Sequence, residues 1–209
     1  MFLTRWAIII ASIGCGALQA QEVSHFAFSV GGGFTQTMGN AGRHLDNGWN
    51  LGAGIGVNVT NHFGIMVDAG YNRFGINGAS LTRAGFPNGN VSVFSATLDP
   101  VFHVNASSHV DMYIIGGGGL YHTRREFTQP STSTFAGFDP FFGFYNVSVP
   151  TTEILASYSV NKPGANLGAG VAIGTRWHGK LFAEARYHRI FLGNERHADY
   201  IPVSVGFRW

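Results

Sequence analysis

The last nine residues of the chain alternate strictly between apolar side chains and small, polar or charged ones. One face carries Ile201, Val203, Val205, Phe207 and Trp209, and the other carries Pro202, Ser204, Gly206 and Arg208. A period of two places successive side chains on opposite faces of a β-strand. A strand with one fully apolar face suits a lipid bilayer better than water, because a membrane barrel turns apolar residues toward lipid and polar residues toward its lumen.

Seven further segments show the same kind of alternation. The clearest is Trp49–Val59, in which apolar residues alternate with Asn and Gly. The others are Phe26–Phe34, Phe63–Tyr71, Val91–Phe102, Val110–Tyr121, Asn166–Thr175 and Leu181–Tyr187. Val110–Tyr121 is apolar or Gly on both faces after Asp111, which leaves its phase open. Together the segments predict an all-β fold, an eight-stranded antiparallel up-and-down transmembrane β-barrel.

The connections between these segments alternate in length. Three are short: Thr60–His62, Asn105–Ser108 and Arg176–Lys180. Four are longer: Thr35–Gly48, Asn72–Asn90, His122 to about Ala165, and Gly193–Asp199. This pattern predicts three periplasmic turns and four outer loops. We expect part of the third and longest loop, around Glu153 to Val160, to extend the barrel strands beyond the membrane.

The N-terminus is typical of an export signal. Arg5 precedes the apolar run Trp6–Ala11, and small residues follow as far as Ala20. We therefore expect residues 1–20 to be a cleaved secretory signal peptide and residues 21–209 to form the barrel domain. The apolar run is shorter than a spanning helix requires. The single cysteine, Cys15, lies in this segment, which leaves a lipid-anchored alternative open.

The composition fits a membrane location. Only 11% of the residues are charged, less than half of the roughly 25% that is usual in soluble domains. The net charge is +2 and the Lys and Arg residues are scattered, which argues against a nucleic-acid partner. The expected surroundings of the chain are the lipids of the outer membrane.

The lumen of an eight-stranded barrel is nearly filled by side chains. The charged residues predicted to face inward are Asp68, Asp99, Asp111, Glu184, Arg186 and Arg208. An unpaired buried charge costs several kcal/mol, so these groups must pair. We predict a plug of ion pairs centred on Glu184 and Arg186, with the inward glycines making room for it. A proton or ion path, or a catalytic dyad, is the alternative for the same residues.

No cofactor, metal or catalytic site is predicted. The nine His residues are dispersed without metal-ligand spacing, although His188 and His197 could approach one another across the last loop. The glycine runs Gly52–Gly56 and Gly116–Gly119 lack the following helix that a phosphate loop needs.

The third outer loop contains an aromatic run. Its rings are Phe138, Phe141, Phe142, Phe144 and Tyr145. They are a candidate contact surface for an extracellular ligand of unknown identity. Alternatively, they pack over the barrel mouth or sit at the lipid interface.

These features resemble the bacterial outer-membrane β-barrel family, whose best-known relatives are the transmembrane domains of outer membrane protein A-like proteins. The resemblance rests on the signal peptide, the eight segments, the stretch Glu184–Tyr187 and the ending Tyr200–Trp209. It implies localisation in the Gram-negative outer membrane and recognition of the ending by the barrel assembly machinery. Family members usually end in Phe, whereas this chain has Trp209. No peptidoglycan-binding domain is expected after the barrel.

The resemblance specifies a barrel rather than an activity. We expect a structural or surface-display role without catalysis. The alternatives are a small adhesin or ligand-binding barrel, a lipid A-modifying enzyme, and a narrow pore. Related deacylases place a His two residues before a Ser, but here Ile190 stands two residues after His188. A soluble lipocalin-type barrel would turn its apolar residues inward instead.

Overall fold

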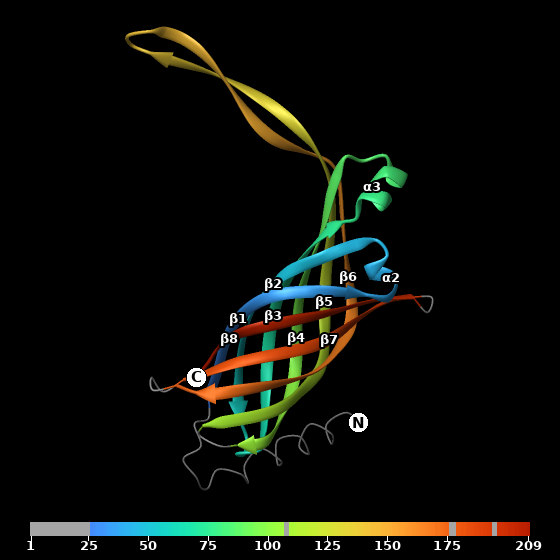
Figure 1. Ribbon diagram of the computed structural model, residues 1–209, viewed down its shortest axis with the longest axis vertical. Helices are drawn as coiled ribbons and strands as arrows, with labels where there is room; N and C mark the ends of the chain where they lie inside the picture. The colour runs from blue at the N-terminus through green and yellow to red at the C-terminus, as the bar shows by residue number, and fades with distance from the viewer. Residues whose placement is uncertain (1–25, 107–108, 176–178, 194–195) are drawn as a thin grey trace, which may run out of the picture.

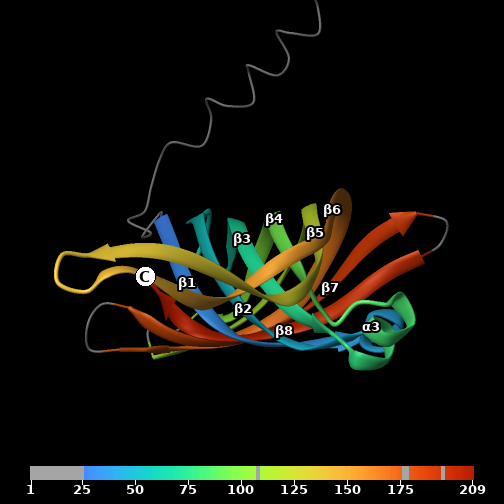
Figure 2. The same cartoon turned by 90° about the horizontal axis from the view of Figure 1, so that it is seen from above.

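The computed structural model describes residues 26–106, 109–175, 179–193 and 196–209. This part of the chain forms one closed antiparallel barrel of eight strands, in which β1 pairs back to β8 (Figures 1 and 2). The strands are β1 (Phe26–Met38), β2 (Leu45–Asn58), β3 (Phe63–Ile76), β4 (Asn88–Ala106), β5 (Val110–Asp139), β6 (Gly143–Gly174), β7 (Lys180–Gly193) and β8 (Arg196–Arg208). The predicted fold class is confirmed. The expected signal peptide and Cys15 lie outside the described residues.

The barrel wall follows the alternation of the sequence. In β2 the outward side chains of Trp49, Leu51 and Ile55 are about half exposed, whereas the inward Asn50 is buried. The structure also fixes the phase of β5: Tyr113 and Ile115 point into the lumen and are buried, while the residues between and beside them face outward. Closure pairs every strand with two neighbours, so no backbone edge faces lipid.

The connection between β2 and β3 is tight. The backbone N–H of Val59 donates to the carbonyl of Phe63 at 2.9 Å, and the Thr60 hydroxyl oxygen accepts from the N–H groups of His62 and Phe63 at 3.2 and 3.0 Å. A Thr side chain that bonds to the backbone ahead of it favours a turn over a continued strand.

The opposite end carries two short helices, α2 (Gly39–Gly42) and α3 (Gly78–Ala84), on the side of the long β5–β6 hairpin (Figure 1). The Asn77 side chain caps α3 by accepting from the N–H groups of Ala79 and Ser80. Gly85 ends the helix with φ +76°, a left-handed conformation that glycine adopts without strain. In the described part of the chain, no helix has the length and hydrophobicity needed to cross a membrane.

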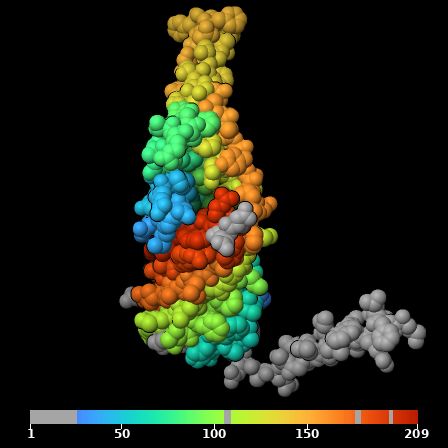
Figure 3. Space-filling model, turned by 90° about the vertical axis from the view of Figure 1, so that its right-hand side faces the viewer, coloured from blue at the N-terminus to red at the C-terminus, as the bar shows by residue number. Residues whose placement is uncertain are grey.

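The structure confirms that strand continues through Glu153–Val160 and corrects the prediction that the rest of His122–Ala165 is a loop. β5 and β6 stay paired as far as Asp139 and Gly143, so the segment His122–Ala165 is a β-hairpin closed by residues 140–142. Space-filling atoms show it as a narrow stalk at one end of the molecule (Figure 3). The outer half of the hairpin is solvated on both faces, so its polar and apolar residues do not alternate along the strand. Its Thr and Val residues nevertheless favour β-structure.

The lumen is filled in layers. One apolar cluster contains Met66, Val101, Tyr113, Ile115, Ala172 and Phe182, and lies toward the short turns. A second contains Phe74, Val91, Val93, Tyr121, Ile190 and Tyr200, and lies toward the hairpin end. Along β7 the inward residues run from Phe182 in the first cluster through Glu184, Arg186 and His188 to Ile190 in the second. A polar layer is therefore enclosed between two apolar ones.

Candidate functional site

The polar layer is built by the inward positions of β3, β4 and β7, facing glycines on neighbouring strands. A Cβ atom at Gly54 would overlap the carboxylate of Asp68, and one at Gly117 would overlap that of Asp99. Glycine at these positions leaves the room that longer side chains on adjacent strands occupy.

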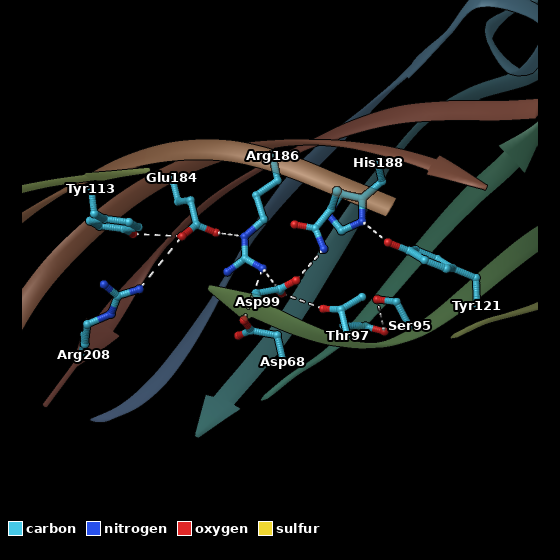
Figure 4. Close-up of polar contacts among 12 residues, drawn as sticks. Asp68, Ser95, Thr97, Asp99, Tyr113, Tyr121, Glu184, Arg186, His188 and Arg208 are labelled. Carbon is cyan, nitrogen blue, oxygen red and sulfur yellow. Dashed lines mark hydrogen bonds and ion pairs between the residues drawn. The ribbon is translucent and has the colours of Figure 1, made fainter. Parts of the chain in front are cut away.

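Arg186 is the centre of the layer (Figure 4). Its Nη1 atom lies 2.9 Å from Oδ2 of Asp99 and 3.2 Å from Oδ2 of Asp68. Its Nε atom donates to the carboxylate of Glu184. One guanidinium from β7 therefore joins carboxylates of β3, β4 and its own strand.

Asp99 is fully buried and accepts three side-chain hydrogen bonds. Besides Arg186, the Thr97 hydroxyl donates to Oδ2 at 2.7 Å and the Asn166 amide donates to Oδ1 at 2.8 Å. A buried carboxylate is tolerable only when paired and hydrogen-bonded in this way.

Glu184 links the polar layer to the apolar cluster near the short turns, which contains Tyr113. The Tyr113 hydroxyl donates to its Oε2 at 2.9 Å, and Nη2 of Arg208 lies 4.0 Å from the same oxygen (Figure 4). The Arg208 guanidinium also lies over the Tyr113 ring at 4.3 Å, which is a cation–π distance.

Five of the six predicted lumen charges thus lie in one connected network. The sixth, Asp111, belongs to a separate group nearer the short turns. Its Oδ1 lies 2.8 Å from Nδ1 of His103 and its Oδ2 lies 3.1 Å from Nζ of Lys180.

Sequence reasoning missed several polar residues of the lumen. A neutral group joins the Thr35 hydroxyl to Asn72 at 2.8 Å and the Ser204 hydroxyl to Asn50 at 2.7 Å. Asn50 also donates to the Thr35 hydroxyl at 3.2 Å. Asn50, Asn166 and Ser204 occupy inward positions of the predicted segments, which is a usable signal. Thr35 and Asn72 fall in predicted outer loops, because β1 and β3 continue beyond the predicted segments to Met38 and Ile76. Tyr113 could not be placed, because the phase of its strand was open.

His188 is enclosed by aromatic side chains. Its Nδ1 atom lies 2.9 Å from the Tyr121 hydroxyl, and its ring stacks on that of Tyr200 at 5.0 Å. His197 instead lies 3.2 Å from Asp199 near the outer rim. Among the described residues, no group of three or more His, Cys, Asp or Glu side chains is arranged to hold a metal ion. Both glycine runs lie within strands, β2 and β5, with no helix after them.

The space left beside the network is small. A cavity of about 80 Å³ is lined by Asp68, Glu184 and Arg186 together with glycines of β1 to β3. A cavity of this size admits a few water-sized molecules and no substrate chain.

The two other predicted sets lie on the outside of the molecule. In the β8 set, the Val205, Phe207 and Trp209 side chains are at least half exposed on the outer wall. Trp209 is held by reciprocal backbone hydrogen bonds with Phe28 at 2.7 and 2.9 Å.

The predicted aromatic set lies at the tip of the hairpin. Phe141, Phe142 and Phe144 are 84 to 91% exposed, so their rings do not pack over the barrel mouth. The Asp139 carboxylate closes the tip by accepting from the N–H groups of Phe141 and Phe142 at 2.8 and 3.0 Å.

Comparison with known proteins agrees with this architecture. The family described as outer membrane protein beta-barrel domain matches residues 7–208, so the chain belongs to this family and its location is the outer membrane. No curated protein sequence matches the chain.

The barrel is similar to several solved structures. Neisserial surface protein A superposes with a TM-score of 0.56 and 16% identity, covering 88% of this chain and 95% of that chain. Ail of Yersinia pestis, solved with the heparin analogue sucrose octasulfate, gives a TM-score of 0.48 and 17% identity, covering 88% and 99%. OprG of Pseudomonas aeruginosa gives 0.48 and 12%, covering 88% and 95%. At 16% identity, the similarity to Neisserial surface protein A shows a shared fold and nothing about function.

Proposed function

We propose that this protein is a closed, non-catalytic barrel that stabilises the outer membrane and displays its outer hairpin. The main support for a closed lumen is the ion-paired layer in which Arg186 contacts Asp68, Asp99 and Glu184. This layer lies between two apolar clusters. Such a layer obstructs diffusion, because an entering ion would have to separate buried ion pairs.

Conductance in planar bilayers tests the closed lumen. The purified chain is expected to give no large, stable current steps, and a steady open level would contradict the proposal. Arg186→Ala is expected to produce current fluctuations that the wild type lacks. Arg189→Ala is the matched control, because Arg189 lies three residues further along β7 and pairs with Asp199 at 3.0 Å outside the central layer.

The absence of catalysis is part of the same proposal. His188, the residue nearest to a deacylase pattern, lies in the lumen against Tyr121 and Tyr200 rather than on the lipid-facing wall. A lipid acyl chain outside the barrel would not reach its ring. Release of fatty acid from lipid A in vesicles carrying the folded protein would contradict this proposal.

A second candidate function is adhesion through the hairpin tip. The exposed rings of Phe138, Phe141, Phe142, Phe144 and Tyr145 support it. A contiguous exposed apolar patch is a feature of protein–protein and membrane interaction sites. Replacing all five with Ser should abolish binding of cells to the purified protein, while Val147→Ser with Val149→Ser on the shaft should leave it intact. Equal binding of cells by both variants would contradict adhesion through the hairpin tip.

We also propose that the outward set of β8 is recognised by the barrel assembly machinery during insertion. Its support is the continuous apolar face formed by Ile201, Val203, Val205, Phe207 and Trp209 on the outer wall. The residues 1–20 would direct export and be removed beforehand.

A further inference from the structure

On the neighbouring strands β3, β4 and β5, the outward side chains change from apolar to basic toward the hairpin end of the barrel (Figure 1). One row of paired outward residues, Ala53, Ala69, Ala96 and Leu120, is entirely apolar. The next row toward the hairpin end contains Leu51, Tyr71, Phe94 and His122, and the row after it contains Trp49, Arg73, Ser92 and Arg124. Two arginines therefore stand directly above an aromatic band.

The height of this boundary agrees with the edge of a bilayer. The outward residues of β3 are apolar from Phe63 to Tyr71, eight residues apart. At about 3.3 Å per residue and a tilt of about 40°, this stretch spans roughly 20 Å along the membrane normal. The apolar band of such barrels is about 25 Å tall and is flanked by aromatic residues. Arg73 and Arg124 are thus placed at the level of the outer headgroups.

The side chains at this boundary form an open, basic hollow. A cavity of about 300 Å³ is lined by Tyr71, Arg73, Phe94, His122, Arg124 and Glu126. Arg73 and His122 are exposed, and the Arg124 side chain is 52% exposed. Within the described residues, the Arg73 guanidinium makes no ion pair. The hollow therefore brings two guanidinium groups to the headgroup layer, and that of Arg73 has no carboxylate partner within the described residues.

Neighbouring residues hold the hollow in shape. Nδ1 of His122 lies 2.7 Å from Oδ1 of Asn161, and Nε of Arg124 donates to the Ser157 hydroxyl at 3.3 Å. One acidic group opposes the basic ones: Oε1 of Glu126 lies 2.7 Å from Nη2 of Arg124. Glu126 thus competes with any anion for Arg124.

We propose that this hollow binds a phosphate group of lipid A in the outer leaflet. Guanidinium groups recognise phosphate through charge-assisted, bidentate hydrogen bonds. Phe94 and Tyr71 below them offer an apolar surface to the acyl chains of the same molecule. The site is on the outer wall and does not depend on whether the lumen is closed.

Native mass spectrometry of the full chain in detergent tests the proposal. Bisphosphorylated lipid A should bind at least about tenfold more tightly than the same lipid after dephosphorylation. Inorganic phosphate at millimolar concentration should not displace it, which distinguishes a lipid headgroup from a free phosphate site. Equal binding of the two lipids, or displacement by inorganic phosphate, would overturn the proposal.

Charge variants locate the site. Arg73→Gln with Arg124→Gln should weaken lipid A binding about tenfold or more. Arg43→Gln with Arg83→Gln makes the same change in net charge at exposed positions of the outer loops, and should leave binding unchanged. An equal loss in both double variants would show a general effect of net charge and would refute the site.

Glu126→Gln provides the opposite test. Removal of this carboxylate frees Arg124, so lipid A should bind more tightly than to the wild type. Heat-dependent electrophoretic mobility reports folding of each variant before binding is measured. If the double arginine variant does not fold, the sign of the Glu126→Gln effect decides: weaker or unchanged binding would reject the proposal.

Discussion

Nη1 of Arg186 lies 2.9 Å from Oδ2 of Asp99, and this contact joins β7 to β4 across the lumen. The two strands are not neighbours in the ring, since β5 and β6 separate them. Asp99 has no solvent exposure, and the Arg186 side chain is 12% exposed. The barrel is therefore tied through its centre as well as by the backbone ladder of its wall.

Arg186→Met should destabilise the folded barrel strongly. The substitution leaves Asp68, Asp99 and Glu184 without their shared cation, and an uncompensated buried charge costs about 3–5 kcal/mol. Urea unfolding in lipid vesicles, followed by tryptophan fluorescence, measures the change. Arg189→Met should have a much smaller effect, because the Arg189 side chain is 43% exposed and its ion pair is screened by water. Similar losses in the two variants would show that Arg186 has no special role.

Tyr113→Phe isolates the hydrogen bond to Glu184. The ring remains beneath Arg208, while the donor 2.9 Å from Oε2 is lost. We expect a loss of about 1.5–3 kcal/mol in the free energy of unfolding, the usual range for hydrogen bonds to charged groups. Tyr71→Phe is the control, because its hydroxyl contacts Ser92 on the outer wall at 3.0 Å. If Tyr113→Phe costs no more than Tyr71→Phe, Glu184 does not depend on this donor.

Two glycines of β2 should respond differently to the same substitution. A Cβ at Gly54 would overlap Asp68 and lie 2.8 Å from the Ser29 hydroxyl, so Gly54→Ala should cost about 1–3 kcal/mol through overpacking. A Cβ at Gly52 meets nothing nearer than the Ala69 carbonyl at 3.5 Å. Gly52→Ala should leave stability unchanged or raise it by about 0.5 kcal/mol. Thermal unfolding in vesicles compares them, and the reverse order would contradict the steric role of Gly54.

Phe207→Ser with Trp209→Ser tests recognition of β8. Insertion into vesicles that contain the barrel assembly machinery should slow by about tenfold, a barrier increase of about 1.4 kcal/mol. Leu51→Ser with Ile55→Ser removes two outward side chains of similar fractional exposure from β2 and should have a smaller effect on the rate. If the two variants insert equally slowly, hydrophobic area rather than the β8 set decides insertion.

The period-two pattern was sufficient to predict the barrel because one face of each strand meets lipid and the other meets the lumen. The same pattern placed Asp68, Asp99, Glu184, Arg186 and Arg208 on inward positions, where the structure joins them. It failed in β5, where Tyr113 and Ile115 fill the lumen with apolar surface opposite an apolar outer face. When both faces of a strand are apolar, the sequence does not show which residues point into the lumen.

The partners of each charge could not be obtained from the pattern. Asp111 faces inward as expected, yet it lies near His103 and Lys180 rather than Arg186. Which inward residues meet depends on the stagger between strands, and that is set by closure of the whole ring. The outer hairpin was predicted only around Glu153 to Val160, since a segment solvated on both faces shows no alternation.

The paired shaft of the β5–β6 hairpin has a consequence for immune recognition. From Thr128 to Asp139 each residue has a partner on β6, so the segment projects as a paired two-stranded ribbon of roughly 35 Å at about 3.3 Å per residue. The surface that the shaft presents to an antibody therefore combines residues of both arms. Short linear peptides copied from either arm would therefore make poor vaccines against the intact bacterium.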